Sequence, residues 1–359
     1  MSRWPMLSIN SDQLVFNANR IIQKCRERNI TVTGVTKGLS GHPEFARILL
    51  NAGCEWLADS RMDNIYHLKK LFPGIPMMLI RIPMKSEIPS LVEYADSSLV
   101  SMKEILPMIE RACVERKKTH EIMMMVDLGD LREGLMEKDI HDFARTLRKC
   151  PHVMCTGIAV NFGCFGGVIP TPDKLEELIR WGTQLSSELG YEISWYSGGA
   201  TSTLIRIEDG SLPAGVNHLR IGEAFLLGTD CTGQRDIPYL SQETMILECE
   251  VVEIRTKPSV PFGTIGADAF GNIPSFEQRG RRKRAIVAIG KQDLRIEGIE
   301  PIAKGIEVLG ASSDHLILDV ESAEEPLILG DKIGFRVNYG SMLSLSTSSY
   351  VNVEFVQKT

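Results

Sequence analysis

The fold is decided by the stretch Ile30-Thr31-Val32-Thr33-Gly34-Val35-Thr36-Lys37-Gly38-Leu39-Ser40-Gly41-His42. Residues 30–35 are β-branched apart from one glycine, a composition that favours a buried strand. The strand ends near Lys37, and two glycines then turn the chain away. A lysine at the C-terminal end of a buried strand loses water, which lowers the pKa of its amine and prepares it for carbonyl chemistry. A solvated lysine after an edge strand is the alternative interpretation of this stretch alone.

The bulk composition is that of an ordinary water-soluble protein. The chain has 359 residues, a net charge of −6 and 43% hydrophobic residues, a length that suits one large barrel plus a smaller domain. This charge argues against nucleic acid as the main partner. Because no run approaches about 18 apolar residues and residues 1–5 lack the apolar core of a signal peptide, we expect no membrane span.

The cysteines and histidines are scattered along the chain. None of the eight cysteines forms a C-x-x-C pair, and several lie in apolar segments, so we expect reduced thiols in a cytoplasmic protein. The seven histidines show no paired spacing. The sequence therefore predicts no metal site.

Short apolar runs alternate with helix-length amphipathic stretches from residue 30 to about residue 228. This alternation predicts an α/β fold with an N-terminal TIM-type (β/α)₈ barrel, which we assign to residues 1–234. The expected strands are Ile30–Thr36, Glu55–Ala58, Pro76–Ile80, Ser97–Val100, Glu121–Val126, Val153–Val160, Glu192–Trp195 and Asn217–Ile221. The expected helices include Ser101–Lys117, Lys138–Lys149 and Pro172–Leu189, the last with Thr171 as its N-cap and Gly190 past its end.

Polar and charged residues follow most of the expected strands. The C-terminal ends of barrel strands meet at one mouth, so these side chains should converge on a single cavity. Polar residues commonly follow strands, but the arginines, the lysine and the glycine turns together indicate a site for an anionic ligand. In chain order the strand exits carry Lys37; Asp59-Ser60-Arg61; Arg81; Ser101; Asp127 with Arg132; Asn161; Ser197-Gly198-Gly199; and Arg220 with Glu223.

One exit has the composition of a phosphate site. The run Ser197-Gly198-Gly199-Ala200-Thr201-Ser202-Thr203 combines two glycines with hydroxyl residues at the start of an expected helix, Thr201–Ile207. Backbone N–H groups and hydroxyls at such a turn can bind phosphate without a lysine. A second such turn is Ile221-Gly222-Glu223.

The pattern changes after about Gln234. Strand-length runs then follow one another at short spacing, which predicts an all-β domain over residues 235–359. The basic run Arg281-Arg282-Lys283-Arg284 is expected to be a solvated turn before a strand. The expected strands are Met245–Arg255, Arg284–Gly290, Glu307–Leu309, His315–Val320 and Asp331–Val337.

Taken together in order and spacing, several motifs resemble the alanine racemase family, which contains pyridoxal 5′-phosphate enzymes with an N-terminal barrel and a C-terminal β domain. The resemblance covers nearly the whole chain. It lies in Val35-Thr36-Lys37-Gly38, Val126-Asp127-Leu128-Gly129-Asp130-Leu131-Arg132-Glu133-Gly134, Leu219-Arg220-Ile221-Gly222-Glu223 and Gly310-Ala311-Ser312-Ser313-Asp314-His315. The middle motifs and residues 263–272 are most similar to the ornithine racemase branch.

The resemblance implies a role for each barrel residue. Lys37 would form the internal aldimine with pyridoxal phosphate, and Arg132 would lie by the phenolic oxygen of the cofactor or by the substrate carboxylate. Arg220 would face the pyridine nitrogen. Arginine has only donors, so it would leave that nitrogen unprotonated, which favours simple proton removal and return. The remaining cofactor contacts would come from Asn161, Ser197, Thr201, Ser202, Gly222 and Glu223.

Racemisation needs a proton-transfer group on each face of Cα. Lys37 can serve one face. In alanine racemases a tyrosine from the β domain of the partner subunit serves the other, which implies a head-to-tail homodimer. Lys291 occupies that position here, so the second group stays open among Lys291, Asp268, Cys164, Tyr339 and Tyr350. Asn161 is a further departure, because a histidine often stands at its position.

The substrate implied by the ornithine racemase branch is a diamino acid such as ornithine or lysine. Its distal ammonium needs an acidic partner, for which Asp268, Asp314 and Glu133 are candidates. Ser313, next to Ser312, could offer backbone N–H groups to the substrate carboxylate.

Three other functions stay open. The first is racemisation of a neutral amino acid such as alanine or serine. The second is a lyase similar to D-threonine aldolase, which would need a late His–Cys metal pair, whereas only His315 follows His218 and no cysteine follows Cys249. The third is a non-enzymatic cofactor carrier, and such carriers end soon after the barrel.

Overall fold

The computed structural model describes residues 3–357 and divides the chain into two compact units. Asp12–Gln242 form one unit, and the described residues before Asp12 together with those after Gln242 form the other. The division predicted from sequence, at residue 234, placed the first residues with the barrel. They join the β unit instead because β1 (Met6–Asn10) pairs antiparallel with β12 (Met245–Pro258) and parallel with β18 (Asn352–Val356).

The unit Asp12–Gln242 is a closed parallel barrel of eight strands in sequence order, with β9 paired to β2. This confirms the predicted fold class. β8 begins three residues after the start of the expected run Glu192–Trp195. The strands are β2 (Thr31–Val35), β3 (Trp56–Asp59), β4 (Met77–Leu79), β5 (Ser97–Val100), β6 (His120–Val126), β7 (Val153–Val160), β8 (Trp195–Ser197) and β9 (His218–Ile221).

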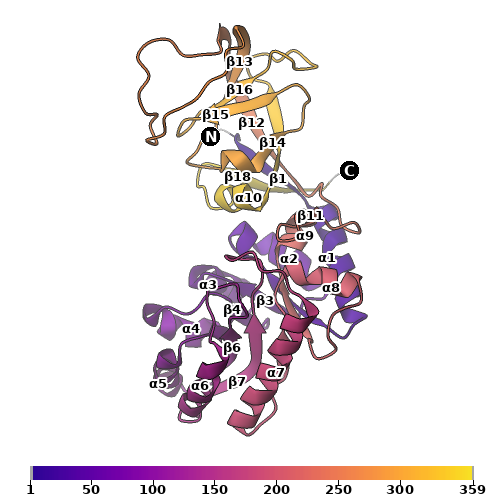
Figure 1. Cartoon of the computed structure of the whole chain (residues 1–359), viewed down its shortest axis with the longest axis vertical. Helices are drawn as coiled ribbons and strands as arrows, with labels where there is room; N and C mark the ends of the chain where they lie inside the picture. The colour runs from indigo at the N-terminus through magenta and orange to yellow at the C-terminus, as the bar shows by residue number, and fades with distance from the viewer. Residues whose placement is uncertain (1–2, 358–359) are drawn as a thin grey trace. The chain divides into compact units, whose positions relative to one another are not determined.

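Helices surround these strands (Figure 1). The predicted helix Pro172–Leu189 is α7, with Pro172 in its first turn. Gly190 ends it with a left-handed φ of 81°, whereas the Thr171 side chain makes no capping hydrogen bond. The others are α1 (Ser11–Arg26), α2 (Pro43–Ala52), α3 (Met62–Leu71), α4 (Ile88–Tyr94), α5 (Leu106–Arg116), α6 (Ile140–Leu147), α8 (Leu204–Glu208) and α9 (Glu223–Leu227).

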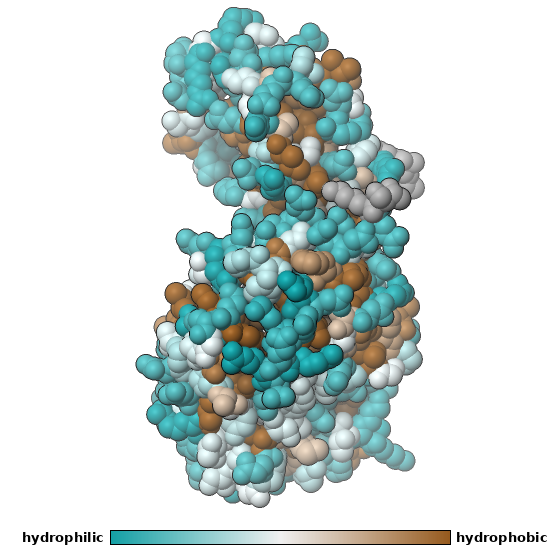
Figure 2. Space-filling model, turned by 90° about the vertical axis from the view of Figure 1, so that its right-hand side faces the viewer, coloured by the Kyte–Doolittle hydropathy of each residue, from teal (hydrophilic) through white to brown (hydrophobic). Residues whose placement is uncertain are grey.

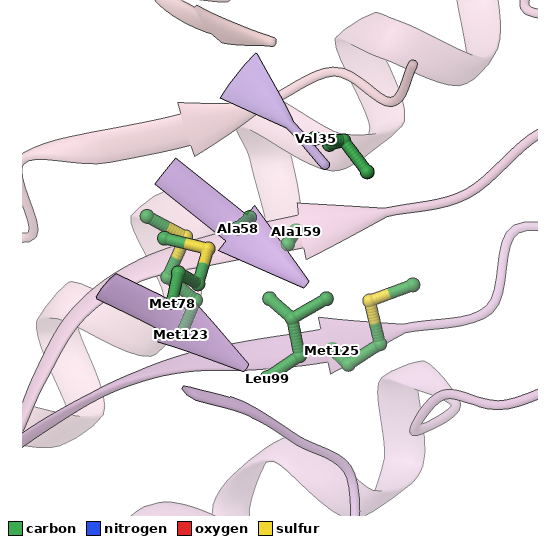
Figure 3. Packing of buried hydrophobic residues seen from close by; sticks show 7 residues of the cluster. All are labelled: Val35, Ala58, Met78, Leu99, Met123, Met125 and Ala159. Carbon is green, nitrogen blue, oxygen red and sulfur yellow. The ribbon is translucent and has the colours of Figure 1, made fainter. Parts of the chain in front are cut away.

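The interior of the barrel is packed with apolar side chains from strands β2 to β7 (Figure 3). Methionine is flexible and fills irregular gaps, and three methionines do so here. A filled barrel is no channel, and the active sites of such barrels lie above this layer, at the C-terminal ends of the strands. The cluster consists of Val35, Ala58, Met78, Leu99, Met123, Met125 and Ala159.

The second unit is built on a mainly antiparallel sheet in the order β14-β17-β12-β13-β16-β15, in which β1 also pairs with β12 and β18 pairs with β1. The sequence did not predict β1, β14 or β18. Its other elements are β13 (Arg281–Val287), β14 (Ile299–Pro301), β15 (Glu307–Ala311), β16 (Leu316–Asp319), β17 (Lys332–Val337) and α10 (Tyr339–Leu345).

The prediction of a turn at Arg281–Arg284 is wrong. These residues begin β13 and pair with the end of β12, Arg281 opposite Pro258. Their charges find partners across the sheet: Arg282 Nε lies 2.8 Å from Asp319 Oδ2, and Arg284 Nη2 donates to the Ser259 carbonyl at 2.8 Å. Tertiary pairing therefore outweighs the tendency of a charged run to form a turn.

Within residues 3–357, no helix has the length and apolar character needed to cross a membrane. Hydrophilic residues cover much of the viewed face of each unit, with hydrophobic residues interspersed among them (Figure 2).

Candidate active site

Lys37 begins a 3-10 turn, Lys37–Leu39, directly after β2. The residue before it is held firmly: buried Thr36 donates its hydroxyl to Asp59 Oδ2 at 2.7 Å. Asp59 Oδ1 in turn accepts hydrogen bonds of 3.0 Å from the Arg61 backbone and the Asn64 side chain. The ends of β2 and β3 are thereby fixed to each other, and Lys37 starts from a rigid position at the barrel mouth.

Burial lowers the pKa of the Lys37 ammonium below its ordinary value of 10.5. The positive charge of Arg132 acts in the same direction, while Cys164, Asp59 and Glu133 oppose it. A lowered pKa increases the fraction of neutral amine, the form that can attack a carbonyl or accept a proton.

Arg220, on β9 next to β2, is 3% exposed, and its guanidinium is held by several acceptors. Nη1 donates to Ser197 Oγ, and Nη2 donates to the Val160 carbonyl at 2.8 Å and to Asn161 Oδ1 at 2.9 Å. Burial, assisted by Arg132, lowers the pKa of Arg220 to about 10. The side chain therefore stays charged at neutral pH and acts as a fixed donor.

His218 continues this network toward the barrel interior. Its Nδ1 lies 2.7 Å from Ser197 Oγ, and its Nε2 lies 2.7 Å from Thr33 Oγ1. Burial and the charge of Arg220 hold the pKa of His218 well below 6.5, so the ring is neutral. Ser197 therefore positions Arg220. His218 was not identified from sequence, although it lies two residues before Arg220 and so faces the same side of β9.

The predicted site residues Arg132 and Asn161 meet at Glu133. Arg132 forms a bidentate ion pair with the Glu133 carboxylate, and Asn161 Nδ2 donates to Glu133 Oε1 at 2.9 Å. Because Asn161 Oδ1 accepts from Arg220, the Asn161 amide links Arg220 to the carboxylate that pairs with Arg132. Glu133 is thus occupied by these partners, which disfavours it as the partner of a substrate ammonium.

The proposed phosphate turn contains a buried polar atom without a partner. Ser202 Oγ, on a residue that is 5% exposed, finds no hydrogen-bond partner within residues 3–357. Thr201 Oγ1 accepts the Ala224 backbone N–H at 3.1 Å, which joins this turn to the one at Gly222. Gly199 has a φ of +110°, a conformation that favours glycine. An orphaned hydroxyl at two joined turns fits a phosphate.

The Glu223 side chain binds the residues that follow α9 rather than the phosphate turn. Its Oε1 accepts the Cys231 backbone N–H at 2.7 Å and the Thr229 hydroxyl at 3.0 Å. Gly222 packs closely on β2, since a Cβ there would lie 3.2 Å from Val35. The Glu223 side chain is therefore occupied, and a phosphate at this turn would meet backbone groups only.

The β unit brings together Lys291, Asp268 and the turn at Ser313. Lys291 Nζ lies 3.8 Å from Asp268 Oδ2, and the Lys291 backbone N–H donates to the Ser312 carbonyl at 2.9 Å. Asp314 instead faces His315, whose Nδ1 lies 2.9 Å from its Oδ1. Hydrogen bonds from His315 and Ser313 lower the pKa of Asp314, so it stays ionised.

The other candidates for the second proton-transfer group lie elsewhere. Cys164 belongs to the barrel unit and lies in the exposed segment after β7, where it acts to raise the pKa of Lys37. Tyr339 begins α10, and Tyr350 is 68% exposed. In the described range 3–357, no group of three or more His, Cys, Asp or Glu side chains is arranged to hold a metal ion.

A family model described as "Alanine racemase, N-terminal domain" matches residues 9–230. The chain belongs to the alanine racemase family. This confirms the resemblance seen in the sequence, and members of the family depend on pyridoxal phosphate. A lysine racemase of Thermotoga maritima is 42% identical over 349 residues, 97% of each chain. An ornithine racemase of Acetoanaerobium sticklandii is 39% identical over 354 residues, 98% of this chain and 100% of the relative.

Solved structures show the same fold at low sequence identity. An alanine racemase of Clostridium difficile matches with a TM-score of 0.75 and 18% identity, covering 98% of this chain and 96% of that one. One from Bacillus anthracis matches with a TM-score of 0.76 and 16% identity, covering 99% and 96%. These family members carry the same arrangement of a barrel and a β domain.

Proposed function

We propose that this chain is a cytoplasmic racemase that depends on pyridoxal phosphate and interconverts the L and D forms of a diamino acid, ornithine or lysine. The single observation that carries the proposal is the buried arrangement at the barrel mouth. Lys37, with its lowered pKa, follows β2, and Arg220 is fixed on the adjacent β9. Near full-length identity of about 40% to a lysine and an ornithine racemase supports the substrate class.

The residues present fit the cofactor. Lys37 would hold its aldehyde carbon, the Thr201–Ser202 and Gly222–Glu223 turns its phosphate, and Arg220 its ring nitrogen. When bound, pyridoxal phosphate supplies an electron sink that makes the Cα–H of an amino acid acidic. The orphaned Ser202 hydroxyl supports this assignment, because a buried polar group without a partner is costly unless a ligand completes it.

The chain's own side chains would then perform the proton transfers. Neutral Lys37 takes or returns the proton on one face of Cα, while Arg132, oriented by Glu133, attracts the substrate carboxylate. Ser313 is a second candidate for binding that carboxylate. We place Lys291 of the partner subunit on the other face, within a head-to-tail homodimer in which each β unit completes the barrel mouth of the other subunit.

The test is hydrogen exchange at Cα. A panel of amino acids in deuterium oxide is scored by NMR for loss of the α-proton and by polarimetry for loss of optical activity. We expect both with ornithine or lysine, and neither with Lys37→Ala. Borohydride reduction followed by peptide mapping should find the cofactor on Lys37. Turnover retained in the variant would contradict the proposal.

The same panel separates the other functions. Exchange confined to alanine or serine would favour a neutral amino acid racemase. Release of glycine or acetaldehyde from β-hydroxy amino acids would favour a lyase. A yellow protein that exchanges no α-proton would favour a cofactor carrier.

A further inference from the structure

Lys291 does not extend freely from the β unit, because its ammonium lies against an aromatic ring and a carboxylate. Nζ is 4.1 Å from the centroid of the Phe270 ring and 3.8 Å from Asp268 Oδ2. Both partners come from the long loop between β12 and β13, which leaves the sheet in Figure 1. A ring face beside a carboxylate is the environment that binds primary ammonium groups.

Backbone hydrogen bonds hold the two partners next to each other. Asp268 Oδ1 accepts the backbone N–H groups of Phe270 at 2.9 Å and Asn272 at 2.8 Å. The Asp268 N–H donates to the Asn272 carbonyl at 2.7 Å, which closes the turn. The other carboxylate oxygen remains directed at Lys291. These backbone hydrogen bonds lower the pKa of Asp268, so the carboxylate is ionised at neutral pH.

The main chain of Lys291 is rigid, but its side chain is loosely held. The N–H groups of Lys291 and Gln292 donate to the carbonyls of residues 312 and 313 at 2.9 and 3.0 Å. Gly290 permits this packing, because a Cβ there would lie 2.3 Å from the Ser313 carbonyl. By contrast, the ammonium makes one long ionic contact and one ring contact, and the side chains of Lys291 and Asp268 are 27% and 32% exposed. Contacts of this kind are weak and exchangeable.

We propose that Asp268 and Phe270 form a receptor for the distal ammonium of the substrate, and that Lys291 occupies this receptor until a diamino acid displaces it. This rests on the proposed function. The side chains of lysine and ornithine carry the same primary ammonium on a methylene chain, so they compete for the same two partners. Displacement frees Lys291 when the correct substrate is bound. A neutral amino acid of equal length leaves Lys291 in place.

The first test reads the position of Lys291 by NMR and needs no turnover. In protein labelled with [13Cε]lysine, the Phe270 ring current shifts the Lys291 methylene signal upfield, and Lys291→Arg identifies that signal. Ornithine or 1,4-diaminobutane should move it to the ordinary lysine position, and norvaline should not. In Phe270→Leu the signal should start at the ordinary position. A Lys291 signal that does not move with 1,4-diaminobutane or ornithine, or that moves equally with norvaline, overturns the proposal.

The second test separates binding from chemistry. Asp268→Asn and Phe270→Leu should each raise KM for ornithine by about tenfold while KM for norvaline, followed by α-proton exchange, stays unchanged. Phe262→Leu, on the same loop and 89% exposed, is the matched control and should change neither KM. Equal changes for both substrates would contradict the receptor.

The two proposals fail separately. Absence of α-proton exchange with both ornithine and lysine ends the proposed racemase, whereas 1,4-diaminobutane still tests the receptor. Normal ornithine racemisation with an unmoved Lys291 signal and an unchanged KM in both variants ends the receptor alone.

Discussion

The barrel mouth and the Lys291 cluster of the β unit (Lys291, Asp268 and Phe270) hold their cations in opposite ways. Arg220 is buried and donates to Ser197, Val160 and Asn161. The Lys291 ammonium has one ion-pair contact of 3.8 Å and one exposed ring. A saturated buried network keeps its geometry through a reaction, whereas weak contacts let a side chain leave. We infer that the barrel supplies fixed electrostatics and the β unit supplies an exchangeable group.

The largest effect is expected when the barrel lysine is removed. Lys37→Ala should lower kcat by more than about 10³-fold, because the proposed cofactor anchor and the proposed base are the same group. Activity by polarimetry and the cofactor absorbance band measure it, with circular dichroism as the control for folding. A folded variant that keeps the normal cofactor absorbance band would contradict the assignment of Lys37.

The next effect tests the β unit. Lys291→Met should lower kcat by roughly 10²-fold, the size of one proton-transfer contribution, and change unfolding free energy by less than about 0.5 kcal/mol. Lys304→Met, another exposed lysine of the β unit, is the matched control and should leave kcat unaltered. If Lys291→Met destabilised the protein strongly, the contrast between the two regions would break down.

Arg220→Lys tests the barrel network with the charge retained. A lysine lacks the planar fork that reaches Ser197 and Asn161 together, so the free energy of unfolding should fall by about 2 kcal/mol and kcat by about tenfold. Urea denaturation and initial rates measure both. Unchanged stability would show that the network is not saturated as described.

The smallest effect is the pH dependence of stability. The folded pKa of Lys37 lies below its unfolded value of 10.5, so between the two the unfolded chain binds more protons and stability rises with pH. In the cofactor-free protein, Lys37→Met should therefore be more stable than wild type below the folded pKa. This difference should shrink as pH approaches 10.5. Thermal denaturation across that pH range measures the difference in stability between the variant and wild type. A difference that grows as pH rises would contradict the lowered pKa of Lys37.

The sequence by itself determined the barrel strands, α7 and the positions of Lys37 and Arg220. Strand and helix periodicity, a proline at N1 and a glycine past the end are local signals, and they act over a few neighbouring residues. The family motifs further predicted that Lys37 and Arg220 both serve the same mouth of the barrel. These features do not depend on contacts with distant parts of the chain.

Tertiary structure alone decided which partners these side chains use. β1 joined the β unit because β12 and β18, more than 230 residues away, flank it. Asn161 connects Arg220 to Glu133, and Glu223 serves the turn at Cys231, through contacts that no local pattern encodes. Hydrogen bonds between distant residues depend on how the folded chain aligns them, so the sequence identified the candidate residues and only the fold assigned their partners.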